Sequence, residues 1–97
     1  MTESCLDESG LGGANFENAK LWKCTFINSN LSSSNFDNAE LWDSDFSFAD
    51  LTNATINTQK VNENTKLSDA GFSNTKVSNT VIEICKLQNI DGIIPCD

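Results

Sequence analysis

Large apolar residues recur at every fifth position along much of this chain. Eleven consecutive positions keep this spacing without a gap: Leu11, Phe16, Leu21, Phe26, Leu31, Phe36, Leu41, Phe46, Leu51, Ile56 and Val61. A period of five fits neither a helix, whose apolar face recurs at three and four residues, nor a half-buried strand, whose side chains alternate. The chain therefore contains an internal repeat, which has to be interpreted before any helix or strand is assigned.

A small residue stands two positions before each of the nine centres from Phe16 to Ile56. The set is Ala14, Ala19, Cys24, Ser29, Ser34, Ala39, Ser44, Ala49 and Ala54. The residue between them is mostly polar, as are the two residues after the centre, and residues 49–53 (Ala-Asp-Leu-Thr-Asn) form the clearest copy. Each unit is thus expected to bury one large and one small side chain and to expose the rest.

This pattern resembles the motif of the pentapeptide-repeat family, Ala-(Asp/Asn)-Leu-x-x, and with one phase shift it extends from Leu6 to Ile82. The resemblance implies an all-β fold, a right-handed quadrilateral β-helix with twenty residues in each coil. Sixteen centres then make about four coils, each burying its apolar layer against the next. The expected inward core is Leu11, Phe16, Leu21, Phe26, Leu31, Phe36, Leu41, Phe46, Leu51, Ile56, Val61, Leu67, Phe72 and Val77.

The repeat predicts a single pentapeptide-repeat domain over residues 1–97. Residues 1–10 are acidic and only partly repeat-like, which predicts a partial first coil. Residues 11–82 carry the repeats, with a one-residue insertion near 62–66, because the spacing from Val61 to Leu67 is six. We expect a bulge or small loop at the insertion, after which the stack continues. Residues 83–97 form a C-terminal cap.

The end of the chain changes character at Thr80. Residues 80–83 (Thr-Val-Ile-Glu) have the form of a capping box, and apolar residues follow before the breakers Gly92 and Pro95. A short helix near 81–88 is therefore predicted to cover the open end of the solenoid, as terminal caps must. It would shield the last apolar layer, which is expected to contain Phe72, Val77 and Ile82, and the lid would be extended by Ile90, Ile93 and Ile94.

Residues twenty apart would stack on one face, so neighbouring outward side chains can be predicted from the sequence. Lys20, Glu40 and Lys60 fall in one column, and Lys23 and Asp43 in another. Opposite charges on neighbouring rungs stabilise stacked strands modestly. Both columns are interpreted as structural features.

Trp22 and Trp42 also stack, each directly after a centre and therefore outward. Exposed indoles one rung apart form an apolar patch of the kind that marks partner surfaces. They could equally pack over the face and cover its backbone, so both interpretations stay open. Ile27 and Phe48 are further off-register apolar residues, which makes one side of the solenoid more apolar than the rest.

The chain has four cysteines, Cys5, Cys24, Cys85 and Cys96. Cys24 takes a small inward position and is interpreted as a buried thiol. Family members from the thylakoid lumen carry a cysteine pair in a terminal helical cap, and this resemblance implies a disulfide between Cys85 and Cys96. The spacing also permits two unpaired thiols. A disulfide would place the protein in an oxidising compartment, the periplasm or thylakoid lumen. The absence of a disulfide would instead place it in the cytoplasm.

The composition excludes several function classes. The net charge is −8, and the few lysines are scattered, so neither direct nucleic-acid binding nor membrane insertion is expected. Without histidine or a Cys-x-x-Cys pair, a metal site is not expected. The absence of histidine also removes the commonest general base, and outward carboxylates on a convex solenoid are solvated. No catalytic residue and no cofactor is predicted, so the protein is not expected to be an enzyme.

Two functional hypotheses remain. The first is a non-enzymatic structural or protein-interaction module that contacts an unidentified protein through the Trp22 and Trp42 face. The second comes from the family resemblance: some members are acidic rods that imitate DNA and bind gyrase or a related topoisomerase, which the negative charge would suit. A weak homo-oligomer, formed by end-to-end or face stacking, is compatible with either.

Overall fold

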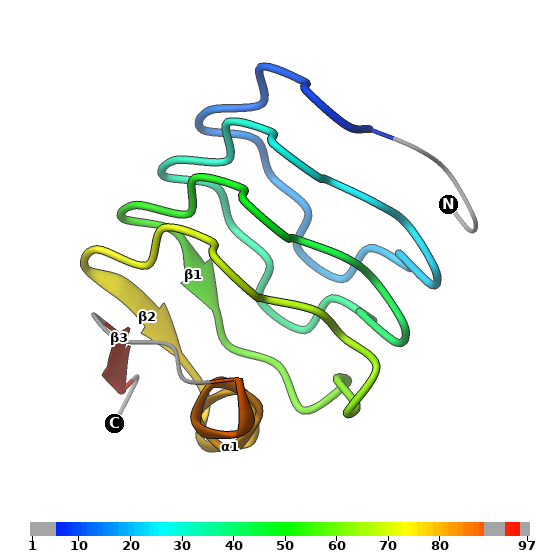
Figure 1. Cartoon of the computed structure of the whole chain (residues 1–97), viewed down its shortest axis with the longest axis vertical. Helices are drawn as coiled ribbons and strands as arrows, with labels where there is room; N and C mark the ends of the chain where they lie inside the picture. The colour runs from blue at the N-terminus through cyan, green and yellow to red at the C-terminus, as the bar shows by residue number, and fades with distance from the viewer. Residues whose placement is uncertain (1–5, 89–92, 96–97) are drawn as a thin grey trace.

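The chain winds into a stack of coils around one axis, with the first described residues at one end of the stack and a helix at the other (Figure 1). The computed structural model describes residues 6–88 and 93–95. Parallel β-bridges join residues that are twenty apart, including Asn15 with Asn35 and Lys20 with Glu40. The molecule measures 29 × 21 × 21 Å. Bridges of this spacing show that a coil contains four five-residue units where the repeat is regular.

Longer secondary structure is found only toward the C-terminus of the described residues. Strands β1 (Thr55–Ile56), β2 (Thr75–Val77) and β3 (Ile93–Pro95) form a parallel sheet in the order β1-β2-β3. Helix α1 (Asn79–Leu87) connects β2 to β3. In the register of the sheet, Thr55 pairs with Lys76 and Lys76 pairs with Ile94.

A tight turn follows most of the centres and explains the five-residue period. The N–H of the third residue after a centre donates to the carbonyl of that centre, as from Ala14 to Leu11 at 3.0 Å. The second residue after the centre has a positive φ, the mark of a type II turn. These residues are Glu8, Gly13, Asn18, Lys23, Asn28, Ser33, Asn38, Asp43, Phe48, Asn53, Asp69 and Asn74. Asparagine, aspartate and glycine tolerate this conformation best, which is why polar residues follow the centres.

The ladder of backbone hydrogen bonds locates the extra residue of the chain. From Leu6 to Leu41, the N–H of each centre donates to a carbonyl nineteen residues ahead, ending with Leu41 to Lys60 at 2.8 Å. From Phe46 onward the separation is twenty, as in the bond to Lys66 at 2.7 Å. The intervening loop is held by Asn62, whose side chain bonds to Asp43, to the Thr65 hydroxyl and to the Asn64 N–H. The stack thus absorbs one residue without losing its alignment.

The interior is a column of inward centres. Those from Leu21 to Val77 are buried, whereas Leu11 and Phe16 are only partly buried because the first coil is covered on one side. Phe16 stacks on Phe36 and Phe26 on Phe46, each pair with ring centroids 4.9 Å apart. The two columns meet edge to face, with centroids 5.4–6.0 Å apart. Each ring therefore packs both along and across the solenoid.

Serine and threonine replace alanine at several small positions without leaving a polar group unpaired. The Ser34 hydroxyl donates to the Leu31 carbonyl at 2.6 Å, and Ser44 bonds to Leu41 in the same way. Thr75 is buried and donates to the Leu51 carbonyl of the preceding coil, so its extra methyl group is accommodated. Among the described residues, no buried side-chain nitrogen or oxygen lacks a hydrogen-bond partner.

The C-terminal cap differs in detail from the sequence prediction. The helix begins at Asn79 rather than 81, and Ser78 caps it, because its hydroxyl accepts the Val81 N–H at 3.3 Å. The expected repeat centre Ile82 is consequently a helical residue and only half-buried. Helix formation turns Val81, Ile84 and Cys85 toward the core in its place.

The residues after the helix do not simply extend a lid. Ile93 and Ile94 belong to β3, which adds a parallel strand beside β2. Ile93 packs against the core, whereas Ile94 remains 37% exposed. Ile90 lies outside the described residues. The tail thus prolongs one side of the solenoid, because the backbone of β2 offers it hydrogen bonds that a packed lid would leave unmade.

Candidate partner-binding surface

Within the described part of the chain, no pocket is found, and no group of three histidine, cysteine, aspartate or glutamate residues could hold a metal ion. The carboxylates of the described residues lie on the outer faces. Hydrogen bonds from the Thr52 hydroxyl and N–H hold the pKa of Asp50 below its ordinary value, so this group favours its ionised form. What the surface offers instead is a set of side chains on a rigid scaffold.

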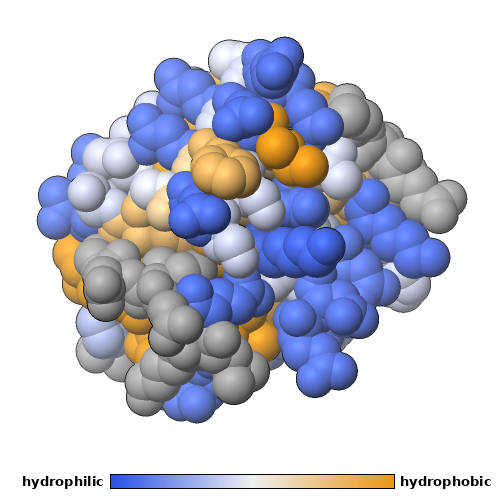
Figure 2. Space-filling view, viewed as in Figure 1, coloured by the Kyte–Doolittle hydropathy of each residue, from blue (hydrophilic) through white to orange (hydrophobic). Residues whose placement is uncertain are grey.

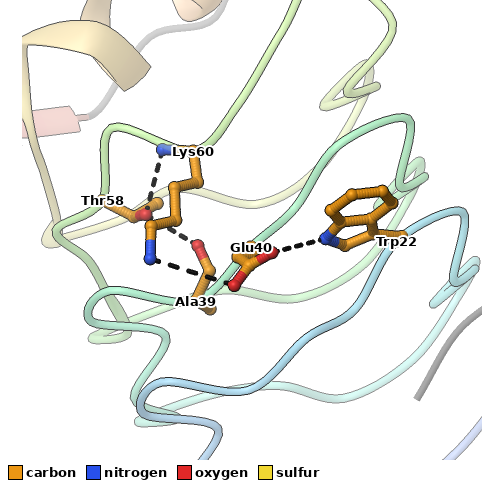
Figure 3. A network of polar contacts seen from close by, with 5 residues as sticks. All are labelled: Trp22, Ala39, Glu40, Thr58 and Lys60. Carbon is orange, nitrogen blue, oxygen red and sulfur yellow. Dashed lines mark hydrogen bonds and ion pairs between the residues drawn. The ribbon is translucent and has the colours of Figure 1, made fainter.

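A short polar network crosses one outer face of the solenoid (Figure 3). The indole Nε1–H of Trp22 donates to Glu40 Oε1 at 2.7 Å, and the other Glu40 oxygen, Oε2, lies 3.9 Å from Lys60 Nζ. We call these three residues the Trp22 network. The side chain of Glu40 is 19% exposed and that of Lys60 is 48% exposed. One carboxylate therefore links an aromatic ring and a cation that come from coils on either side of it.

The backbone beneath this network is held by a threonine. Thr58 is buried, its hydroxyl donates to the Ala39 carbonyl at 2.7 Å, and it accepts the N–H of Lys60 at 3.1 Å. Gln59 stands where the repeat would place a small inward residue, yet it is exposed. The five-residue pattern alone therefore misassigns this position, since the hydroxyl of Thr58 fills the interior one residue early.

The two tryptophans are not equivalent. Trp22 is 45% exposed, whereas Trp42 is less exposed and partly buried. The Lys23 N–H donates to the Trp42 carbonyl at 2.9 Å, which places the two indole-bearing turns on adjacent rungs. In the next column, Asp43 accepts from the Asn62 side chain at 3.0 Å. The Glu40–Lys60 ion pair of the sequence prediction is present, and the indole of Trp22 joins it from a position that sequence spacing did not indicate.

Phe48 is the most exposed large apolar side chain in the described structure, at 59%. It occupies the second position after the centre Phe46, with a φ of 61°. A bulky residue is an outlier in this region of backbone conformation. Ile27, on the preceding coil, is half-buried. Figure 2 shows that hydrophobic residues form small areas among mostly hydrophilic ones on the face viewed there.

Replacing Phe48 by asparagine should stabilise the fold. Asparagine occupies the same turn position at Asn18, Asn28, Asn38, Asn53 and Asn74 and accepts a positive φ more readily than phenylalanine. We expect Phe48→Asn to raise the free energy of unfolding by about 1 kcal/mol, measured by urea denaturation. The reciprocal variant Asn53→Phe should lower it by a similar amount. Destabilisation by Phe48→Asn would show that the exposed ring packs on its surroundings.

The cysteine predictions meet different outcomes. Cys24 is buried at a small inward position, and its Sγ lies 3.7 Å from the Trp22 carbonyl oxygen. Cys85 is a buried free thiol on α1, and Cys96 lies outside the described residues. The predicted Cys85–Cys96 disulfide is therefore not supported. Helix α1 turns Cys85 inward, and its side chain is fully covered.

Burial raises the pKa of the Cys85 thiol to about 11 from an ordinary 9.0. A raised pKa means that the folded state favours the protonated thiol, so its contribution to stability is complete below pH 9.0 and is lost as the pH rises toward 11. We expect up to about 3 kcal/mol of stability to disappear over this range. Thermal melts from pH 8 to 11 should show a steeper decline for the wild type than for Cys85→Ala. Parallel declines would contradict the prediction.

The repeat, the stacked parallel rungs and the positive-φ turns together define a solenoid protein built from five-residue units. A family model described as pentapeptide repeats matches the chain with eight copies, over residues 11–45 and 29–57. The chain belongs to the pentapeptide-repeat family, whose repeats generally form a right-handed β-helix. No curated protein matches it. In the described residues, no helix combines the length and apolar character needed to cross a membrane.

Proposed function

We propose that this chain is a non-enzymatic protein-interaction module that binds an unidentified partner protein through the Trp22 network. The family match supports a repeat protein with a role in protein interaction. We also propose that its solenoid is a right-handed quadrilateral β-helix of about four coils, supported by twenty-residue bridges and by turns at five-residue spacing. The rigid stack then serves to present an outer face rather than to enclose a site.

The observation that carries this proposal is the state of Trp22. Its indole nitrogen is fixed to Glu40 at 2.7 Å, yet the side chain keeps 45% of its surface exposed. Tryptophan is one of the residue types enriched at energetic hot spots of interfaces. A ring that is already held in place loses little conformational entropy when a partner covers it. Trp22 is thus a preorganised aromatic anchor.

The charges of the module indicate the chemistry of the partner. The chain carries a net charge of −8, so long-range attraction favours a partner with a basic surface. The exposed Lys60 ammonium, beside Glu40, offers a local site for a partner carboxylate or carbonyl. The proposed complex therefore combines a pocket for the indole, an acceptor near Lys60 and basic groups at the rim.

Site-specific photo-crosslinking in the cells that make the protein tests this function. The crosslinking amino acid p-benzoylphenylalanine replaces Lys60, which sits in the Trp22 network, or Lys76, an exposed outward residue of β2 that serves as the matched control. We expect a discrete protein adduct from position 60 and none from position 76. The adduct should disappear when Trp22→Ser is added and persist when Phe48→Asn is added.

The double variant Trp22→Ser with Trp42→Ser checks that loss of the adduct reflects the surface and not the fold. We expect it to remain folded by circular dichroism, because both indoles lie outside the core. A large drop in melting temperature would instead assign the indoles to packing. Identical adducts from positions 60 and 76 would overturn the proposed surface. An adduct with gyrase would favour the DNA-mimic hypothesis, which a supercoiling assay would then test.

A further inference from the structure

The two ends of the solenoid differ in how they are capped. At the C-terminal end, α1 lies beyond the last coil, and Val81, Ile84 and Cys85 cover its apolar layer (Figure 1). The outermost strand there is β3, which ends in Pro95. Proline has no N–H to donate and blocks further strand addition. This end is therefore closed to another coil.

Within the described residues, no such cap covers the first coil. In each regular rung, the outward residue directs both backbone groups at the coil before it: Asn30 donates to the Ser9 carbonyl at 2.9 Å and accepts the Leu11 N–H at 2.8 Å. Gly10, Asn15 and Lys20 hold the equivalent positions of the first coil. Within the described residues, the backbone N–H and carbonyl groups of these three form no hydrogen bond. Three sides of the end therefore present an unpaired strand edge.

The apolar layer of the first coil is also incompletely covered. Leu6, Leu11 and Phe16 are partly buried, whereas the corresponding centres of the next coil, Phe26, Leu31 and Phe36, are fully buried. Apolar side chains framed by unpaired backbone groups are the surface that each coil presents to the next inside the stack. Its natural complement is the end of another coil.

We propose that a second copy of this chain docks head to head on the first coil and forms a two-fold dimer. The edges at Gly10, Asn15 and Lys20 would pair with the same edges of the second copy, and the half-covered apolar layers would meet between them. Because α1 and Pro95 close the opposite end, association stops at two chains and does not continue into a filament.

The size and charge of this end set the strength of the dimer. A cross-section of 21 × 21 Å offers about 440 Å² on each copy, below the roughly 800 Å² per partner of a standard stable interface. Each copy also carries a charge of −8, so the two repel. We therefore expect a dissociation constant between about 10 μM and 1 mM that falls as salt screens the repulsion.

Sedimentation equilibrium of the whole chain, in 50 mM and 500 mM NaCl, tests the proposal. The wild type should show a monomer–dimer equilibrium that is at least about threefold tighter at the higher salt. Asn15→Pro combined with Lys20→Pro removes two edge donors that bond to nothing within the described chain, and should weaken dimerisation at least about tenfold. Ile94→Lys, at the closed end, should leave it unchanged.

Deletion of residues 2–5 tests whether the N-terminal segment, and not a second copy, occupies this edge. If the proposal is correct, the deletion leaves the dimer intact or strengthens it. A wild type that stays monomeric at 1 mM, or a dimer that Ile94→Lys abolishes and the proline variant does not, would overturn it. Should the proline variant fail to fold, amide exchange in the wild type decides: the N–H groups of Gly10, Asn15 and Lys20 must gain protection as concentration rises.

Discussion

Leu41→Lys should unfold the protein at room temperature. Leu41 is 1% exposed in the middle of the solenoid, between the layers of Leu21 and Val61. A lysine there would place an ammonium group among apolar side chains, where no carboxylate reaches it, and the cost of such burial exceeds the total stability of a small domain. Circular dichroism should show loss of the cooperative melt, and amide proton signals should lose their dispersion.

Asn57→Lys is the matched control for this variant. Asn57 is exposed and directly follows Ile56, so the same lysine should change the free energy of unfolding by less than about 0.5 kcal/mol. If Leu41→Lys melts like the wild type while both proteins are folded, the inward register described for the centres would be incorrect.

Phe36→Ala should be the second most damaging substitution, with an expected loss of about 3–5 kcal/mol. Phe36 stacks on Phe16 at 4.9 Å and meets Phe26 and Phe46 edge to face, at 6.0 and 5.4 Å between centroids. Removing its ring leaves a cavity that spans two columns of the core, and backbone hydrogen bonds on both sides of the rung prevent the coils from closing it. Urea denaturation measures the loss.

Phe16→Ala gives the comparison that isolates this effect. Phe16 makes the same stacked contact with Phe36 but belongs to the partly covered first coil. Its loss should therefore cost clearly less than that of Phe36, because solvent already reaches part of the ring. Equal losses for the two variants would mean that the first coil is as well covered as the interior in solution.

The surface shows where prediction from sequence stops. Stacking of residues twenty apart predicted the Glu40–Lys60 pair, which the structure contains. It did not predict that Trp22 bonds to Glu40, because these residues are eighteen apart and the bond depends on the direction of the indole. The same applies to Phe48, whose positive φ follows from its turn position and is not signalled by residue type.

The C-terminal cap also shows where prediction from sequence stops. A helix at this end was predicted, but its start, its cap at Ser78 and the inward positions of Val81, Ile84 and Cys85 were not. The capping-box form of residues 80–83 was the stronger sequence signal. Ser78 prevails because its own hydroxyl also donates to the Thr58 carbonyl at 2.6 Å, a contact between segments twenty residues apart.

By itself, the sequence determined the repeat, the inward and outward positions of the body and the family, because a five-residue period of apolar side chains can be buried only if the backbone turns at every unit. The tertiary structure alone decided three things: which indole is anchored, how the inserted residue near Asn62 is absorbed, and which end of the stack is closed. These depend on side-chain directions and on hydrogen bonds between coils, which join residues that are not neighbours in the chain.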